Sequence, residues 1–305
     1  MVGSDRPAQA PVRDLGQAIG VHLARPPRPK FSRLLGQSAH NGCLSYIRTV
    51  LDRIALISDV HGNVTALQAV LADIRARDIT RIINLGDVVG KGPRNSEAIK
   101  LTRENCEATV RGNWDAFIAQ SAELPPGAQW VRDQLSPDDL TWLAALPSTF
   151  ELVMSGRRIR LFHASATSEF VRVRVRHSRE EFRRMFTNTE FTGDFLAGGA
   201  QPGVTPDVVG YGDIHDSYLE VAEGLMLFNV GATGNHLDAP TAPYAVLEGV
   251  ADSLQPTSFS VTFTRVGYDI ESEIAIAREL DMPSSDAYAR ELLDGIYRGR
   301  PGASE

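Results

Sequence analysis

The sequence contains little cysteine and no long apolar run. Its two cysteines, Cys43 and Cys106, cannot build a disulfide framework and lack the spacing of a zinc finger. No stretch approaches the roughly 20 apolar residues that a membrane-spanning helix needs. The N-terminus also lacks the basic and then apolar pattern of a secretory signal. We therefore expect a protein of the cytoplasm that does not associate with a membrane.

A broad basic surface is also absent from most of the chain. The formal net charge is −7, but residues 1–50 hold seven of the 31 Lys and Arg residues and only two of the 38 acidic residues. The remainder has 24 basic and 36 acidic residues, a net charge of −12. Because nucleic-acid binding depends mainly on Lys and Arg at the phosphates, we expect no stable complex with nucleic acid.

The composition divides the chain into three parts. Residues 1–50 include the Pro-rich segment 26–29 and no sustained apolar period, so we predict a disordered or loosely attached extension, or the product of a mistaken translation start. A basic tail that touches nucleic acid or anionic lipid is the less favoured interpretation. Residues 51–268 form the predicted main domain, in which the polar, partly helical segment 167–206 is a candidate cap insertion. Residues 269–305 are predicted to form helices that pack on this domain.

Apolar periodicity predicts an α/β fold. The run 54–57 suits a strand that is buried on both faces. Apolar residues at i, i+3, i+4 and i+7 within 65–78 form one stripe of an amphipathic helix, and residues 116–146 are predicted to be helical. Further strands are expected at 82–85, 108–110, 151–154, 158–162, 207–211, 218–221, 226–230, 244–247 and 258–264.

Five short segments place potential metal ligands just after predicted strands. On an extended backbone, residues two apart point to the same side. Asp59 and His61 are therefore expected to bind one ion together, as are Asp213 and His215. A carboxylate has two oxygens, so Asp87 could bridge two cations. The remaining candidates are Asn113 and His163.

These ligand candidates comprise three His, three Asp and one Asn, without a thiolate. Mixed imidazole and oxygen ligands suit Mn, Fe, Zn, Co or Ni better than Mg alone. Seven protein ligands are too many for one catalytic ion with an open position. They suit two ions about 3.5–4 Å apart, which can polarise a phosphoryl group and lower the pKa of a bridging water. Each motif alone is more often an ordinary turn or a hydrogen-bonded core histidine, but the ordered set of five indicates a metal centre.

The ordered set resembles the calcineurin-like metallophosphoesterase superfamily over residues 54–247. The likeness is strongest to its small bacterial phosphodiesterase-like branch, in the segments 58–63, 86–93 and 229–234. The resemblance implies a four-layer α/β/β/α sandwich of two mixed sheets flanked by helices. It also implies two divalent ions, with the following ligands: Asp59, His61 and His215 for the first, Asn113, His163 and Asp213 for the second, and Asp87 as the bridge.

Two positions depart from the family's pattern. Many members have a histidine where this chain has Trp114, and that histidine contacts the phosphate and helps to protonate the leaving group. An indole cannot act as an acid near neutral pH. Because general acid catalysis is commonly worth roughly 10²–10⁴-fold, substrates with poor leaving groups should suffer most. The usual Gly-His-x-His is Gly212-Asp213-Ile214-His215 here, so Asp213 is expected to bind the metal, or alternatively to hydrogen-bond His215.

Several basic residues are candidates for substrate binding. Lys91 lies where the protein-phosphatase members carry a phosphate-binding arginine, although a solvated surface lysine is an equal alternative. Arg111 and His236 are weaker candidates, because such residues are more often structural. The basic alternation 172–176, followed by His177, is interpreted either as an exposed edge strand or as part of a cap that meets the substrate.

We therefore predict a metal-dependent phosphoric ester hydrolase, with a phosphodiesterase favoured, in which a metal-bridging hydroxide attacks phosphorus. Mn is the favoured metal, and the substrate is a small phosphate ester, with nucleotides among the candidates. A phosphoprotein phosphatase or a dinucleoside polyphosphate hydrolase is the alternative enzyme, and a non-catalytic metal-binding scaffold is an alternative of another class. The predicted catalytic residues are Asp87, Asn113 and Lys91, and the predicted substrate-binding residues are Lys91, Arg111 and Trp114.

Overall fold

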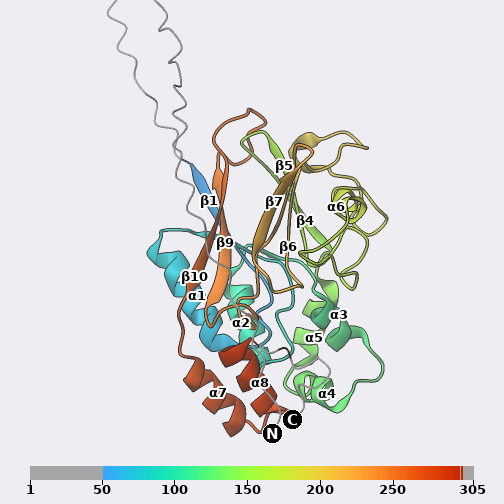
Figure 1. Ribbon diagram of the computed structural model, residues 1–305. Coiled ribbons are helices and arrows are strands. Elements are labelled where there is room, and N and C mark those ends of the chain that lie inside the picture. Colours follow the sequence, from blue (N-terminus) through green and yellow to red (C-terminus); the bar gives the residue numbers. More distant parts are fainter. Residues whose placement is uncertain (1–50, 296, 298–305) are drawn as a thin grey trace, which may run out of the picture. The chain divides into compact units, whose positions relative to one another are not determined.

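The computed structural model describes residues 51–295 and residue 297, all within one compact unit, Arg48–Glu305. The predicted extension 1–50 and the end of the chain, 298–305, lie outside the described residues. Two five-stranded sheets form the centre of this unit (Figure 1). Among the described helices, none is both long enough and apolar enough to cross a membrane.

The first sheet has the strand order β10-β9-β1-β2-β3. Three of its strands run parallel, namely β1 (Asp52–Ile57), β2 (Arg81–Asn84) and β3 (Ala108–Thr109). On the other side of β1, β9 (Ala242–Gly249) and β10 (Ser260–Val266) continue the sheet as antiparallel neighbours. The carboxyl ends of β1, β2 and β3 therefore lie at one edge of the sheet.

The second sheet has the order β4-β5-β6-β8-β7. Its central strands β5 (Arg157–Phe162), β6 (Val208–Tyr211) and β8 (Leu225–Asn229) run parallel. Its edge strands β4 (Thr149–Met154) and β7 (Tyr218–Ala222) are antiparallel to their neighbours. Both sheets are mixed, as predicted, and the predicted strands are all present.

The alternation of side chains along β1 explains why the sheets stack. Ala55 and Ile57 point to the helices, whereas Ile54 and Leu56 point to the second sheet, because successive residues of a strand face opposite sides. Both sets are fully buried. The helices that contribute to the outer core of the first sheet are α1 (Val64–Ala76), α2 (Asn95–Asn105), α3 (Asn113–Gln120), α4 (Pro126–Arg132) and α5 (Pro137–Ala145).

The outer face of the second sheet is covered by the segment 167–206, which contains α6 (Arg179–Arg184) and the short η1 (Ala197–Gly199). Phe182 of α6 packs in a core with Val209 and Leu227 of the sheet. In Figure 1, α6 lies beside the second sheet and α1 lies beside the first. The candidate cap thus supplies the fourth layer, and the predicted α/β/β/α sandwich is confirmed.

The C-terminal helices α7 (Ile270–Glu279) and α8 (Ser285–Asp294) pack against each other. Their shared core contains Ile274, Ala277, Met282, Tyr288, Ala289 and Leu292. A buried carboxylate also joins α7 to the rest of the unit, since Glu273 accepts hydrogen bonds from Thr65 Oγ1 (2.6 Å) and Arg94 Nη2 (2.5 Å). We propose that these helices belong to the folded domain and are needed for its stability.

Two segments differ from the sequence-based expectations. The helix α2 was not predicted, because two of the four buried residues on its inner face, Asn95 and Thr102, are polar. The segment 172–176 is not a strand, so its interpretation as an edge strand is wrong. Val173 is instead buried in the core beneath α6, and Arg172 forms an ion pair with Asp213.

Candidate metal centre

The candidate centre lies where the loops that follow the parallel strands meet. In the first sheet, Ile57 pairs with Asn84 and Asn84 with Thr109, so β1, β2 and β3 end level with one another. The loops then bond to each other, because the N–H of His61 donates to the carbonyl oxygen of Asp87 at 2.9 Å.

The loops of the second sheet reach the same place. The N–H of Thr233, which follows β8, donates to the carbonyl oxygen of Ser58 at 2.8 Å. The N–H of Gly212, which follows β6, donates to the carbonyl oxygen of His163 at 2.8 Å. Gly212 leaves no room for a side chain, since a Cβ there would collide with Ser58 and Asp59. Close approach of the two sheets therefore depends on a glycine at this position.

Five predicted ligands have a left-handed backbone: φ is 53° at Asp59, 50° at His61, 55° at Asp87, 65° at Asp213 and 68° at His215. Our explanation that each Asp-x-His pair lies on an extended strand is therefore wrong, and tight loops bring the side chains together. This conformation costs a non-glycine residue about 1–3 kcal/mol and is most common for Asp, Asn and His. It also occurs in turns elsewhere in the described part of the chain, so the gathering of five such residues at one edge is what sets this edge apart.

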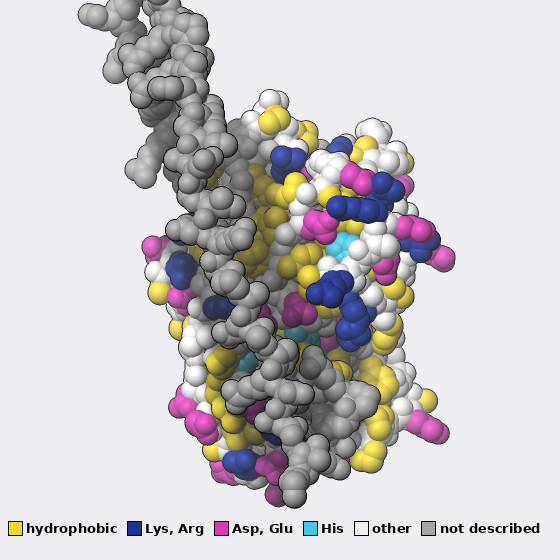
Figure 2. Space-filling model, viewed as in Figure 1, with side chains coloured by type: hydrophobic (Ala, Val, Ile, Leu, Met, Phe, Trp, Pro, Cys, Tyr) yellow, Lys and Arg dark blue, Asp and Glu magenta, His cyan; other side chains and the backbone are white. Residues whose placement is uncertain are grey.

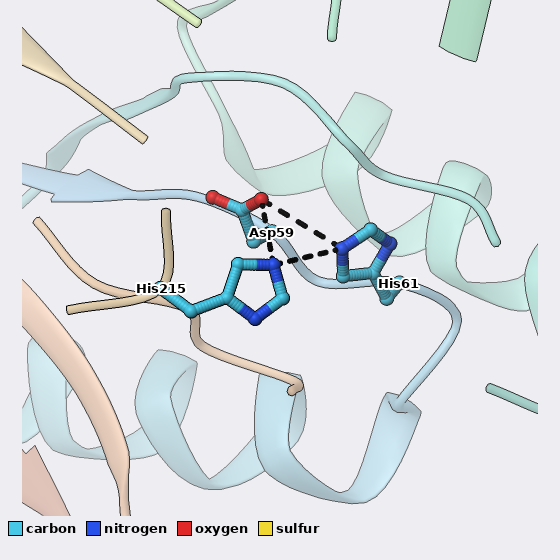
Figure 3. A group of neighbouring side chains, drawn as sticks. All are labelled: Asp59, His61 and His215. Carbon is cyan, nitrogen blue, oxygen red and sulfur yellow. Dashed lines mark hydrogen bonds and ion pairs between the residues drawn. The ribbon is translucent and has the colours of Figure 1, made fainter. Parts of the chain in front are cut away.

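The first cluster consists of Asp59, His61 and His215, whose donor atoms point toward one another in Figure 3. The two Nε2 atoms lie 3.3 Å apart. Asp59 Oδ1 lies 3.4 Å from Nε2 of His215 and 3.7 Å from Nε2 of His61. All three side chains are buried, so these atoms can bind the same ion.

The second cluster consists of Asp59, Asp87 and His163. Asp87 Oδ2 lies 3.5 Å from Nε2 of His163 and 3.6 Å from Nε2 of His61. The carboxylate of Asp87 therefore lies between a histidine of the first cluster and the histidine of the second. This is the position that a bridging ligand requires.

A main-chain carbonyl group orients each histidine of the two clusters. The Nδ1 atoms bond to the following oxygens: His61 to Val89 (3.1 Å), His163 to Leu85 (2.8 Å) and His215 to Asn235 (2.5 Å). Because a carbonyl oxygen only accepts, Nδ1 must carry the hydrogen, and the Nε2 lone pair of the neutral ring faces the cluster. Metal-binding histidines typically have this arrangement.

Two buried atoms in the clusters have no hydrogen-bond partner, namely Asp59 Oδ1 and His163 Nε2. Leaving such an atom unpaired costs about 1–3 kcal/mol. A divalent cation would satisfy both atoms, since carboxylate oxygen and imidazole nitrogen are among its usual ligands. The side chains of the centre therefore fit divalent metal ions.

Burial and neighbouring groups shift the protonation of the first cluster. Burial favours the neutral form of Asp59, but His215, whose Nε2 lies 3.4 Å from Oδ1, lowers the pKa of this carboxyl overall. Burial lowers the pKa of His61 well below its ordinary value, and Lys91 adds to this effect. A carboxylate and a neutral imidazole are the forms that bind metal.

The second cluster carries an excess of negative charge. Burial raises the pKa of Asp87. Burial also opposes protonation of His163, yet the carboxylates of Asp87, Asp59 and Asp213 raise the pKa of this histidine well above its ordinary value. Three acidic groups around one imidazole thus favour a positive charge at this point, which a bound cation would supply.

Asn113 and Asp213 lie beside the second cluster. Asn113 Nδ2 donates to Oδ1 of Asp213 at 2.9 Å, and this oxygen lies 3.9 Å from Nε2 of His163. Arg172 also donates to Asp213, from Nε to Oδ2 at 2.8 Å and from Nη2 to Oδ1 at 2.6 Å. Metal binding by Asp213 stays a prediction, and it would compete with Arg172. The alternative bond to His215 is wrong, because Nδ1 of that ring bonds to a carbonyl group.

The two predicted phosphate-binding cations lie in different surroundings. Lys91 Nζ lies 3.4 Å from His215 Nε2 and donates to Asn235 Oδ1 at 3.2 Å, so it lies at the edge of the first cluster. Arg111 instead pairs with Glu169, with Nη2 and Oε1 2.9 Å apart. Its charge is thus directed toward the segment 167–206, and its role in substrate binding stays a prediction.

Trp114 forms part of the wall of the centre. Its ring makes an edge contact with the ring of His61, with centroids 6.1 Å apart. Its N–H donates to Oδ1 of Asp87 at 2.8 Å. The main chain of this residue therefore positions the predicted bridging carboxylate, and its indole covers the side of the first cluster.

Asp115 is a residue of the centre that the sequence analysis missed. Its carboxylate accepts hydrogen bonds from the N–H groups of Asp87 (2.8 Å), Val88 (2.9 Å) and Gly112 (3.0 Å). Burial and the charge of Asp87 raise the pKa of Asp115 to about 7. The residue joins the loop of Asp87 to the start of α3. Its place at the third position of α3, from which its carboxylate accepts the N–H of Gly112 before the helix, is the signal that could have revealed it.

Comparison with known proteins agrees with this geometry. Residues 53–252 match the family described as the calcineurin-like phosphoesterase superfamily domain. The chain belongs to the calcineurin-like phosphoesterase superfamily. Membership of this metal-dependent family supports a hydrolase of phosphate esters and agrees with the two clusters of metal-binding side chains.

Similar proteins cover most of the domain. A metallophosphoesterase of Sphaerobacter thermophilus is 26% identical, with a TM-score of 0.58 over 80% of this chain and 99% of that chain. A hypothetical protein of Pyrococcus horikoshii OT3, 18% identical, shares the fold with the same TM-score and coverage. An uncharacterized protein of Methanocaldococcus jannaschii is 36% identical over 124 residues, 38% of this chain. The chain spans about half the length of this curated relative, 51%.

Proposed function

We propose that this chain is a dinuclear metal-dependent phosphodiesterase with the seven ligands predicted above. The proposal depends mainly on the three Nε2 lone pairs that converge on the carboxylates of Asp59 and Asp87, where two buried atoms have no hydrogen-bond partner. When bound, two divalent ions would polarise a phosphoryl group and activate a water molecule. Mn is the proposed metal, because imidazole and carboxylate ligands are mixed. The proposed location is the cytoplasm.

The residues around the centre orient and neutralise the substrate. Lys91, at the edge of the first cluster, would bind a phosphate oxygen and stabilise the charge that develops on it. The N–H of Trp114 and the carboxylate of Asp115 hold Asp87 and its loop in place. Because Asp59 and Asp87 are buried, their charges act in a poorly screened environment.

Trp114 favours substrates whose leaving groups are stable as anions. Its indole lies against His61 and cannot protonate a leaving oxygen. The leaving group must then depart largely as an anion, which is easiest for aryl and strained cyclic diesters and for anhydrides. Phosphoprotein phosphatase activity, in which a poor alkoxide leaving group departs, is therefore less favoured than phosphodiesterase activity.

Hydrolysis of bis(p-nitrophenyl) phosphate and p-nitrophenyl phosphate tests the proposal. We expect the Mn-loaded protein to cleave the diester with the higher kcat/KM, chelation to abolish cleavage and Mn to restore it. Asp87→Asn should lower kcat/KM by on the order of 100-fold or more, since a metal ion contributes several kcal/mol. Asp139→Asn, on the exposed start of α5, is the matched control.

Two results would contradict the proposal in different ways. Cleavage of phosphoserine peptides without cleavage of any aryl or cyclic diester would show that the enzyme is a monoesterase. Hydrolysis that survives Asp87→Asn unchanged would show that the activity does not belong to this centre, and a non-catalytic metal-binding scaffold would then be favoured.

A further inference from the structure

Two pockets open beside the centre, and both are lined by Lys91 and Tyr297. The first, here the aromatic pocket, has a volume of about 490 Å³ and is lined by Trp114, Phe117 and Trp130, among others. The second, here the arginine pocket, has a volume of about 480 Å³. It is lined by Arg172, Arg174 and Arg176 together with Asp213 and His215 of the centre.

The arginine pocket contains guanidinium groups suited to an anion. Arg174 and Arg176 are exposed, and neither has an ion pair with any residue that the structure describes. The arginines that follow them differ, because Arg179 and Arg183 pair with glutamates of β7 and of the turn after it. Figure 2 shows Lys and Arg side chains gathered on the half of the molecule that carries the second sheet and α6. The guanidinium groups of Arg174 and Arg176, beside a phosphoesterase centre, suit a phosphate group, because arginine can bind a phosphate through two parallel hydrogen bonds.

The aromatic pocket lies on the other side of Lys91. The ring of Trp114 makes edge contacts with both His61 and Phe117, with centroids 6.1 Å apart in each pair, so Trp114 connects the wall of this pocket to the first cluster. Its wall is mainly apolar, and Trp130 of α4 contributes a second indole. A flat aromatic group such as a nucleobase fits such a wall, because every base can stack on an aromatic side chain. The reacting phosphate at the centre would connect this group to the arginine pocket.

We propose that the substrate is a nucleotide-type ester or anhydride, with a base that enters the aromatic pocket and a second phosphate that binds Arg174 and Arg176. This inference rests on the proposed function, because it takes the centre as the place of the reacting phosphate. Hydrolysis forms a bond between the hydroxyl of water and the reacting phosphorus and breaks the bond from phosphorus to the leaving oxygen. The leaving group departs as an anion, and the proton of water goes to the solvent. Base and second phosphate stay unchanged and serve recognition only.

Binding to the Mn-loaded protein, measured by calorimetry with excess metal, tests this inference. Adenosine 5′-phosphate should bind about 10- to 100-fold more tightly than ribose 5-phosphate, which lacks the base. Adenosine 5′-diphosphate and adenosine 3′,5′-bisphosphate place a second phosphate on opposite sides of the sugar. At least one of them should bind about 10-fold or more tightly than adenosine 5′-phosphate.

Matched variants separate the two pockets. The double variant R174Q/R176Q should abolish the gain from the second phosphate and leave the affinity for adenosine 5′-phosphate unchanged, whereas R179Q/R183Q should change neither. Trp130→Leu should abolish the gain from the base but not the binding of ribose 5-phosphate. Trp142→Leu, in α5 and outside both pockets, is its control, and thermal unfolding confirms that each variant is folded.

These affinities do not require turnover, so the inference is tested separately from the proposed function. Equal affinities for ribose 5-phosphate, adenosine 5′-phosphate, adenosine 5′-diphosphate and adenosine 3′,5′-bisphosphate would overturn the inference. A gain in affinity from the second phosphate that survives R174Q/R176Q would also overturn it. Hydrolysis of aryl diesters together with equal affinities contradicts this inference alone. The predicted affinities without any hydrolysis contradict the proposed function alone.

Discussion

Single side chains near the centre are held in one protonation state by burial. His236 is almost fully buried, and its Nε2 lies 3.0 Å from the hydroxyl of Tyr268. Burial lowers the pKa of His236 from 6.5 to about 4. The folded state therefore binds fewer protons than the unfolded chain between these values, so the stability present above pH 6.5 is lost as the pH falls to 4.

This shift predicts a pH-dependent effect of His236→Gln, which keeps a hydrogen-bonding group toward Tyr268 but cannot be protonated. The free energy of unfolding of the natural protein, relative to the variant, should fall by up to about 3 kcal/mol between pH 7 and pH 4. Urea unfolding at several pH values, with a chelator present, measures this difference. A difference that does not change with pH would show that His236 has an ordinary pKa in the folded state.

Asp115 acts through the backbone of the loop that carries Asp87. Replacing it with Asn puts an amide group where the carboxylate accepts N–H groups of Asp87, Val88 and Gly112. We expect Asp115→Asn to lower the free energy of unfolding by about 2–3 kcal/mol and to weaken metal binding. Asp139→Asn alters the corresponding third position of a helix at the exposed start of α5, and it should cost less than about 1 kcal/mol. Equal losses in the two variants would contradict this role of Asp115.

At the scale of elements, regular structure could be predicted from sequence and the loops between elements could not. Apolar runs such as 54–57 and 82–85 reveal strands, and the ligands follow directly after them. The left-handed backbone at Asp59 and His61 has no such signal, because only contacts with loops from distant parts of the chain impose it. For the same reason α2 was missed, since its polar inner face is buried only by neighbouring elements.

The packing of α7 against α8 predicts a strong contrast between two adjacent residues. Leu292 is fully buried in their shared core, whereas Leu293 is 45% exposed. Leu292→Ala should lower the free energy of unfolding by about 2–5 kcal/mol, and Leu293→Ala by less than about 0.5 kcal/mol. Chemical unfolding measures both values. Similar small losses in both variants would show that the C-terminal helices contribute little to the stability of the domain.

At the scale of the whole molecule, the site exists because two sheets place their carboxyl edges together. The family pattern made this arrangement predictable, together with the convergence of Asp59, Asp87, His163 and His215. Contacts particular to this chain were not predictable. The ion pair between Arg172 and Asp213 joins residues 41 positions apart, and no local pattern identifies such partners. Arg174 and Arg176, in the same segment as Arg172, line the pocket beside the centre. No local sequence pattern predicts this location either.

In the proposed centre, the carboxylate of Asp87 links two metal ions. Titration of the chelator-treated protein with Mn, followed by electron paramagnetic resonance, measures whether two bound ions share this ligand. We expect saturation at two ions per chain with a spectrum of magnetically coupled ions, because ions about 3.5–4 Å apart share a ligand. Asp87→Asn should remove the coupling. Saturation at one ion, or two ions with the spectrum of isolated Mn, would contradict the account.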